Sequence, residues 1–119
     1  MKKINILSKY NKFNDHWSPH FISELNGQQV LIAKVKGEFV WHSHKDEDEL
    51  FHVIKGKLKI EFRDKVVELL PGEIIIVPKG VEHRPCADEE TWILLFEPMT
   101  TKHTGDNVSE ITKSNYPRV

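Results

Sequence analysis

The chain has 119 residues, with 17 lysines and arginines, 18 aspartates and glutamates, and a formal net charge of -1. This length suits one domain with its own core, and the balanced, scattered charge gives no support for nucleic-acid binding, which usually needs a basic face. The single cysteine, Cys86, excludes an intrachain disulfide. Because no stretch resembles a signal-peptide core or a membrane span, we expect a cytoplasmic protein with no membrane partner.

The first residues are expected to form an arm outside the core. Residues 8–20, SKYNKFNDHWSPH, are polar and aromatic and are expected to be irregular. The N-terminal segment carries the large apolar side chains of Phe13, Trp17, Phe21 and Ile22. Because open sheet edges need covering, this region is a candidate for a strand that pairs with a second copy. A homodimer is therefore predicted.

Residues 28–97 are predicted to form short strands separated by turns, with no helical period. Alternating or apolar runs lie at 28–37, 38–44, 49–56, 57–64, 66–70, 74–77 and 92–98. Turn residues separate them at Asp64–Lys65, Pro71–Gly72 and 78–80. The continuous run IIIV at 74–77 is typical of a buried strand. This spacing of 8 to 12 residues favours an all-β sandwich or barrel.

Two histidines one residue apart, His42 and His44, lie in the stretch WHSHKDEDELFHVIKG at 41–56. On a strand they would project from the same face, with their Cα atoms about 6 to 7 Å apart. Val40 shares their parity, so we expect this face to be the inner one. Buried imidazoles need hydrogen-bond partners or a metal. The pair is therefore a candidate for two adjacent ligands of one metal ion.

Two further residues could complete such a site. Glu49 begins the next strand after the turn KDED, and His83 follows the turn PKGVE. Three imidazoles and one carboxylate form a mixed nitrogen and oxygen donor set. Such a set suits divalent Fe, Mn, Co, Ni, Cu or Zn and does not choose among them.

Simpler interpretations stay open at this point. A His-x-His pair is a weak motif by itself, and the acidic run at 46–49 could be a solvated loop. Cys86 has no clear histidine and acid partners for nucleophilic catalysis, and we expect a small buried apolar residue. The remaining histidines are expected at the surface or in packing, and these are His16, His20, His52 and His103.

The spacing within 37–56 resembles the first motif of the cupin family. His42-x-His44 is followed after four residues by Glu49 and after six more by Gly56. Gly37 precedes His42 with four residues between them rather than the usual five, a departure outside the ligand set.

The stretch GEIIIVPKGVEHRPCA at 72–87 resembles the second cupin motif. Pro78-x-Gly80 is followed after two residues by His83, and Ala87 replaces an asparagine often found at the end. The stretch EPMTTKHTGD at 97–106 also resembles the Thr-Gly-Asp close of small single-domain bacterial cupins.

The resemblance implies an all-β double-stranded β-helix, the jelly-roll cupin barrel. It implies a single domain over 1–119, with a core at about 28–98, an N-terminal arm and a C-terminal tail. It also implies that the four metal ligands are His42, His44, Glu49 and His83. Glu47 is the fallback acid if the loop register differs.

The resemblance further implies a divalent metal cofactor (Fe, Mn, Ni or Zn) and a small-molecule ligand in the barrel interior. The expected chemistry is like that of a dioxygenase or a sugar isomerase or epimerase, and the alternatives are a non-catalytic binding module and a structural cupin without metal. Phe51, Trp41 and Trp92 are candidates for the pocket wall, although core packing is favoured for Trp92.

Overall fold

The computed structural model describes residues 1–101 and 116–119. Within them, one short helix precedes seven strands. In chain order these are α1 (Ile6–Tyr10), β1 (His20–Leu25), β2 (Gln28–Glu38), β3 (Glu49–Lys55), β4 (Leu58–Phe62), β5 (Val66–Leu69), β6 (Ile74–Val77) and β7 (His83–Pro98). The prediction of an all-β fold is confirmed.

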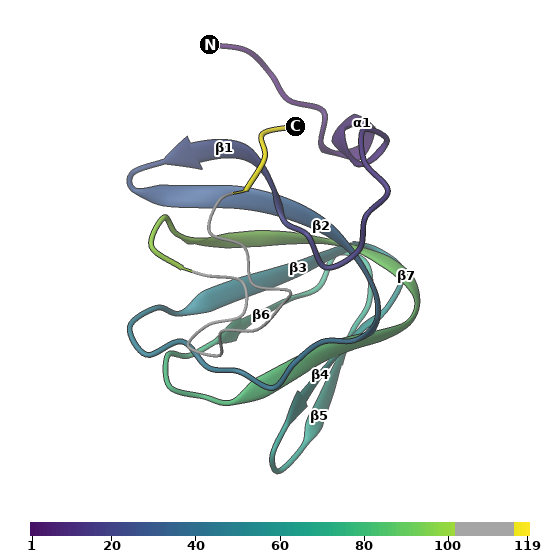
Figure 1. The fold of residues 1–119 in the computed structure, drawn as a ribbon, viewed down its shortest axis with the longest axis vertical. Helices are drawn as coiled ribbons and strands as arrows, with labels where there is room; N and C mark the ends of the chain where they lie inside the picture. The colour runs from purple at the N-terminus through teal and green to yellow at the C-terminus, as the bar shows by residue number, and fades with distance from the viewer. Residues whose placement is uncertain (102–115) are drawn as a thin grey trace.

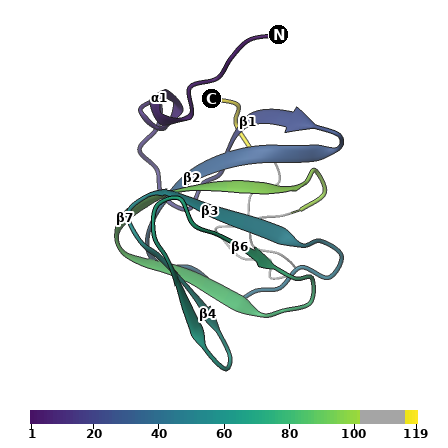
Figure 2. The same ribbon diagram turned by 180° about the vertical axis from the view of Figure 1, so that it is seen from behind.

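The strands form one curved antiparallel sheet in the order β1-β2-β7-β3-β6, with the β4–β5 hairpin attached to β7 (Figures 1 and 2). The long strand β7 connects the two parts of the sheet. Its first half pairs with β4, from His83 opposite Phe62 to Cys86 opposite Lys59, and its second half pairs with β3. Strand β2 runs along the other side of β7. The curved sheet therefore wraps around a single interior.

Alternating side chains fill that interior. Along β3, Phe51 and Val53 are buried, whereas the residues between them are only partly buried. Along β4, Leu58 and Ile60 are fully buried, as the alternating sequence predicts. A smaller apolar cluster lies between the arm and the sheet, and it contains Tyr10, Phe13, Ile22 and Ile32.

Three predictions about the strands are wrong. Residues 39–48 form an extended connection instead of a strand, with one bridge between His42 and His83. Strand β6 is buried on one face only, because it lies at the sheet edge: Val77 is in the core, whereas Ile74 and Ile76 are 55% and 56% exposed. Strand β7 begins at His83 rather than at residue 92, because backbone pairing with β2 and β4 holds a stretch with no clear strand pattern in extended form.

The arm is more ordered than the sequence suggests. Residues 6–10 form α1, whose N-cap Asn5 accepts a hydrogen bond from the Ser8 backbone N–H. Of the residues expected to pair with a second copy, Phe21 and Ile22 lie on β1, which pairs antiparallel with β2 of the same chain. This pairing does not test the homodimer, which stays a prediction.

Among the described residues, no helix has the length and apolar character needed to cross a bilayer. The expectations for His103 and for the Thr-Gly-Asp stretch at 104–106 lie outside the described residues.

Candidate metal centre

The four predicted ligand residues lie together in the interior, although three different parts of the chain carry them. His42 and His44 lie on the connection between β2 and β3, Glu49 is the first residue of β3, and His83 is the first residue of β7. The backbones of His42 and His83 exchange two hydrogen bonds of 3.0 and 2.9 Å. This exchange joins the two motif segments directly. The 39–48 connection therefore needs no full strand to position its histidines.

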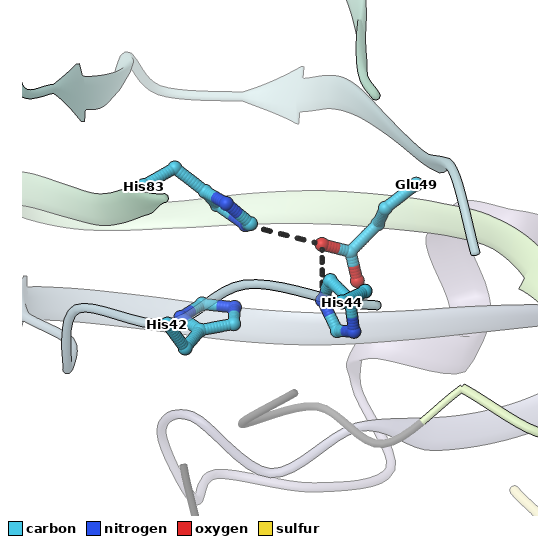
Figure 3. Close-up of side chains that lie close together, drawn as sticks. All are labelled: His42, His44, Glu49 and His83. Atoms are coloured by element: carbon cyan, nitrogen blue, oxygen red, sulfur yellow. Dashed lines mark ion pairs between the residues drawn. The ribbon is translucent and has the colours of Figure 1, made fainter. Parts of the chain in front are cut away.

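The side chains of these residues converge on one point (Figure 3). One donor atom from each lies within 4.8 Å of the others, and all four residues are at most 4% exposed. Glu49 Oε1 is 3.3 Å from His44 Nε2 and 3.5 Å from His83 Nε2. Four nitrogen and oxygen donors at this separation could surround one ion.

Hydrogen bonds to the backbone set which ring nitrogen faces the cluster. Nδ1 of His42 lies 2.9 Å from the Val40 carbonyl oxygen, and Nδ1 of His83 lies 2.9 Å from that of Val81. Since a carbonyl only accepts hydrogen bonds, each Nδ1 carries the proton and donates it. The Nε2 atom of each neutral ring then has a lone pair for a metal. Such an orienting bond is the usual partner of a metal-bound histidine.

The electrostatics of the cluster favour the protonation states that a cation requires. Burial, followed by the neighbouring His83, lowers the pKa of His42 to about 4, so its ring is neutral at pH 7. Burial opposes ionisation of Glu49, but contacts with His44 and His83 outweigh it and hold the pKa of this carboxyl below its ordinary value. Neutral imidazoles and an ionised carboxylate are the forms that bind metals.

The buried polar atoms of the cluster are also suited to contact with a cation. Nε2 of His83 and Oε1 of Glu49 are both buried, and among the described residues neither has a hydrogen-bond partner of good geometry. Buried polar atoms without partners are rare because their desolvation is costly. A cation between them would satisfy both atoms. The donor set is therefore suited to a divalent transition metal, and it does not select the ion.

Glu97, near the end of β7, is a second buried carboxyl beside this cluster that sequence reasoning missed. It is 1% exposed, and burial together with the negative charge of Glu49 raises its pKa well above the ordinary value. Neither of its oxygens makes a hydrogen bond of good geometry with the described residues. The sequence does contain a signal for this residue. Glu97 is an acid within the apolar run WILLFEP, and it follows the buried residues Ile93 and Leu95 at intervals of two, so it is expected on the same face of the strand.

The fallback acid and the other described histidines lie outside the four-residue cluster. Glu47 accepts a hydrogen bond from Thr100 at 3.1 Å. His16 pairs with Glu90, and His20 pairs with Asp15 and stacks on Phe13. His52 is half-buried on β3, with the parity opposite to that of Glu49. These positions agree with the expected surface or packing roles.

Cys86 is half-buried rather than buried. Partial burial raises the pKa of its thiol, which disfavours the reactive thiolate. A nucleophilic role therefore has no support from its surroundings.

A small cavity of about 30 Å³ adjoins the cluster at His42 and Glu49. Strands β2, β3 and β7 line it with Ala33, Val35, Phe51, Ile93 and Leu95. Phe51 thus lies where the sequence predicted, whereas Trp41 and Trp92 are not among the residues that line the cavity. Trp41 packs against the Arg63 guanidinium at 3.8 Å, and Trp92 stacks on Tyr10 at 4.7 Å, in line with the core role favoured for it.

A curved antiparallel barrel that encloses three histidines and a glutamate defines the class: a small β-barrel protein with a site suited to a metal ion. Residues 29–97, more than half of the chain, match the cupin domain family. The chain therefore belongs to the cupin family, and the predicted cupin fold is confirmed.

Known proteins similar to this chain include two that it matches over most of their length. The crystal structure of a cupin-2 domain containing protein from Shewanella frigidimarina is 52% identical, with a TM-score of 0.79, and the match covers 80% of this chain and 93% of that one. The uncharacterized protein YdbB of Bacillus subtilis is 39% identical over 84 residues, which are 70% of this chain and 74% of that protein.

An enzyme is among the more distant relatives. Acireductone dioxygenase of Yarrowia lipolytica is 26% identical over 99 residues, which cover 78% of this chain and only 57% of the enzyme.

Proposed function

We propose that this cupin binds one divalent transition-metal ion and acts on a small organic molecule beside it. The four ligands would be His42, His44, Glu49 and His83. The observation that carries the proposal is their convergence: four buried donors lie within 4.8 Å of one another, and two of the rings are held by backbone carbonyls so that Nε2 faces the cluster. A bound ion would supply a Lewis acid with coordination positions left open for a ligand.

Each part of the site has a defined task in this proposal. The Val40 and Val81 carbonyl oxygens hold the rings of His42 and His83 in one tautomer. Glu49 provides the negative charge that offsets part of the charge of the ion. The apolar side chains around the cavity lower the local dielectric constant, which strengthens electrostatic interactions beside the ion. The likeness to an acireductone dioxygenase supports an oxygen-dependent reaction as the first class to test.

A non-catalytic binding module is the second candidate. The observation in its favour is the composition of the cavity wall: the described residues that line it are apolar except for His42 and Glu49, which are proposed ligands. A general acid or base would then have to come from outside this wall. Metal binding without turnover is the behaviour that this candidate predicts.

The test of metal binding compares His44→Ala with His52→Ala. Protein purified without chelator is analysed for bound metals, and its affinity for added Co²⁺, Ni²⁺ and Zn²⁺ is measured. We expect about one ion per wild-type chain, and we expect His44→Ala to lose at least the ~10- to 100-fold in affinity that even outer-sphere changes cost. His52→Ala should behave as wild type, since His52 is half-buried on the opposite parity of β3. Wild-type protein that takes up none of these ions would refute the proposal.

The test of catalysis uses the metal-loaded protein. Oxygen consumption is followed with a panel of enediols, oxo acids and small aromatic acids, and product formation is followed with sugar substrates. Turnover that disappears in His44→Ala favours the enzyme. Stoichiometric metal with no turnover across the panel favours the binding module.

A further inference from the structure

Two aromatic residues that lie outside the strands form one wall of the cavity beside the candidate metal centre. We propose that this wall, formed by Trp17 and Phe39, limits the ligand of the centre to a small molecule with an apolar body. The inference rests on the proposed function, because it concerns the ligand of the same site. It assigns to the N-terminal arm the selection of ligand size.

The side chains of this wall bound the cavity and so contribute to its small size. Besides the strand residues, Trp17, Pro19 and Phe39 line it. Its volume of about 30 Å³ has room for about two water molecules. Trp17 and Pro19 precede residues 29–97, the part that matches the cupin domain family. The barrel motifs alone therefore do not account for the size of the cavity.

Trp17 is held in place against β2 in an unusual backbone conformation. Its φ is +56°, in the left-handed region that bulky side chains rarely adopt. Its backbone N–H donates to the Lys34 carbonyl at 2.9 Å, and its indole Nε1–H donates to the Lys36 carbonyl at 2.8 Å. Strained residues of this kind persist only where their surroundings fix them, and they cluster at functional sites.

Phe39 connects Trp17 to the metal centre. The two rings are stacked, with centroids 4.7 Å apart and planes 19° from parallel. The Phe39 ring also contacts His42, edge to face at 5.5 Å and 87°. The wall thus extends from the arm to a proposed ligand. A molecule bound at the ion whose body extends toward this side of the cavity would collide with these rings.

The chemistry of the wall also restricts the ligand. A polyhydroxylated sugar needs several hydrogen-bonding groups, and a phosphate is usually bound by cations or backbone N–H groups. No lysine or arginine is among the described residues that line the cavity. The ligand class that fits is a molecule with one oxygen-bearing, metal-binding end and a body of only a few carbons.

The test uses two probes that share a metal-binding end and differ in their bodies. Acetohydroxamate and benzohydroxamate are titrated into Co²⁺-loaded protein, and binding is followed by the visible absorption of the ion. We expect wild type to bind acetohydroxamate at least ~10-fold more tightly, a ratio that a shaped apolar pocket can produce. Trp17→Ala should raise the affinity for benzohydroxamate at least ~10-fold and change the affinity for acetohydroxamate by less than ~2-fold.

Two further variants ensure that the wall is tested in folded protein. Trp17→Gly removes the ring and adopts a φ of +56° without cost, because glycine has no Cβ. Phe39→Leu shortens the other half of the wall. Trp92→Phe is the matched control, since Trp92 stacks on Tyr10 away from the cavity wall and should leave both affinities unchanged. Folding is checked by circular dichroism.

The outcomes separate this inference from the proposed function. Equal wild-type affinity for the two probes, or no gain for benzohydroxamate in the folded wall variants, overturns the inference even if Co²⁺ binds. If Co²⁺ does not bind, the proposed function fails, and the wall is tested in metal-free protein by benzene binding in NMR titrations. Benzene binding to Trp17→Gly but not to wild type then supports the wall, and any other result overturns it.

Discussion

At the scale of single residues, the centre contains two adjacent buried carboxyls whose pKa values are shifted in opposite directions. Contacts with His44 and His83 lower the pKa of Glu49, whereas burial and the negative charge of Glu49 raise the pKa of Glu97. Two adjacent carboxyls rarely ionise together, because their charges repel. The neutral form of Glu97 therefore helps Glu49 keep its negative charge.

The protonation of Glu97 leads to a prediction about alkaline pH. Its folded-state pKa is raised, so its contribution to stability is present at low pH and is lost as the pH rises through that pKa. We expect Glu97→Gln, which is neutral at every pH, to remove part of the loss of stability that begins as the pH rises above the ordinary pKa of a glutamate. The measurement is urea unfolding of metal-free protein with EDTA, from weakly acidic to alkaline pH.

Glu24→Gln is the control, because Glu24 is an exposed carboxylate on β1 and does not contribute to the shifted pKa of Glu97. An unchanged pH profile in Glu97→Gln would show that Glu97 is ionised in the folded protein at neutral pH.

At the scale of elements, the tight turn between β3 and β4 depends on Gly56. Its φ is +94°, and a Cβ atom at this position would lie 2.6 Å from Thr91 Oγ1 and 3.0 Å from Thr91 Cα. Thr91 is fully buried and its hydroxyl donates to the Lys57 carbonyl, so it has little room to move. This turn joins β3 to β4, and the last residue of β4, Phe62, pairs with the proposed ligand His83.

Gly56→Ala is therefore expected to be much more destabilising than alanine at another glycine with positive φ. Gly27 has a φ of +79° and open space where a methyl group would lie, so Gly27→Ala should cost only about 1 kcal/mol. Gly56→Ala adds a steric clash with backbone atoms and should cost at least ~3 kcal/mol. Chemical denaturation gives both values, and equal costs would contradict the proposed role of the Thr91 contact.

At the scale of the whole molecule, the described part of the chain has exposed apolar side chains along one edge of the sheet. Strand β6 pairs with β3, and its outward side chains Ile74 and Ile76 are more than half exposed. Val66 and Leu70, in and just after β5, are exposed to a similar degree. Exposed apolar edge strands are sites of pairing with another chain. We therefore propose this edge as the interface of the predicted homodimer, as an alternative to the N-terminal arm.

The dimer prediction is tested by the solution mass. Light scattering at micromolar concentration should give twice the chain mass of 13.9 kDa for wild type, and Ile76→Lys should give the mass of one chain, because a charge cannot be buried cheaply in an apolar contact. Leu7→Lys is the control, since Leu7 is equally exposed on α1, away from β6 (Figure 1). A wild-type mass of one chain would rule the dimer out.

The sequence by itself determined the fold family and the four residues of the cluster. Alternation along β3 and β4 indicated the inward faces, because side chains of a strand point to opposite sides with a period of two. The resemblance of two stretches to the cupin motifs indicated His42, His44, Glu49 and His83 as one set, which residue chemistry alone left open.

Only the tertiary structure decided which surfaces meet. The exposure of β6, the early start of β7 and the pairing of β1 with β2 depend on neighbouring strands, which local pattern does not contain. The position of Trp17 beside Phe39 and of Glu97 beside Glu49 depends on contacts between segments distant in the chain. The physical reason is that hydrophobic periodicity records whether a side chain turns inward, whereas long-range packing decides what it meets there.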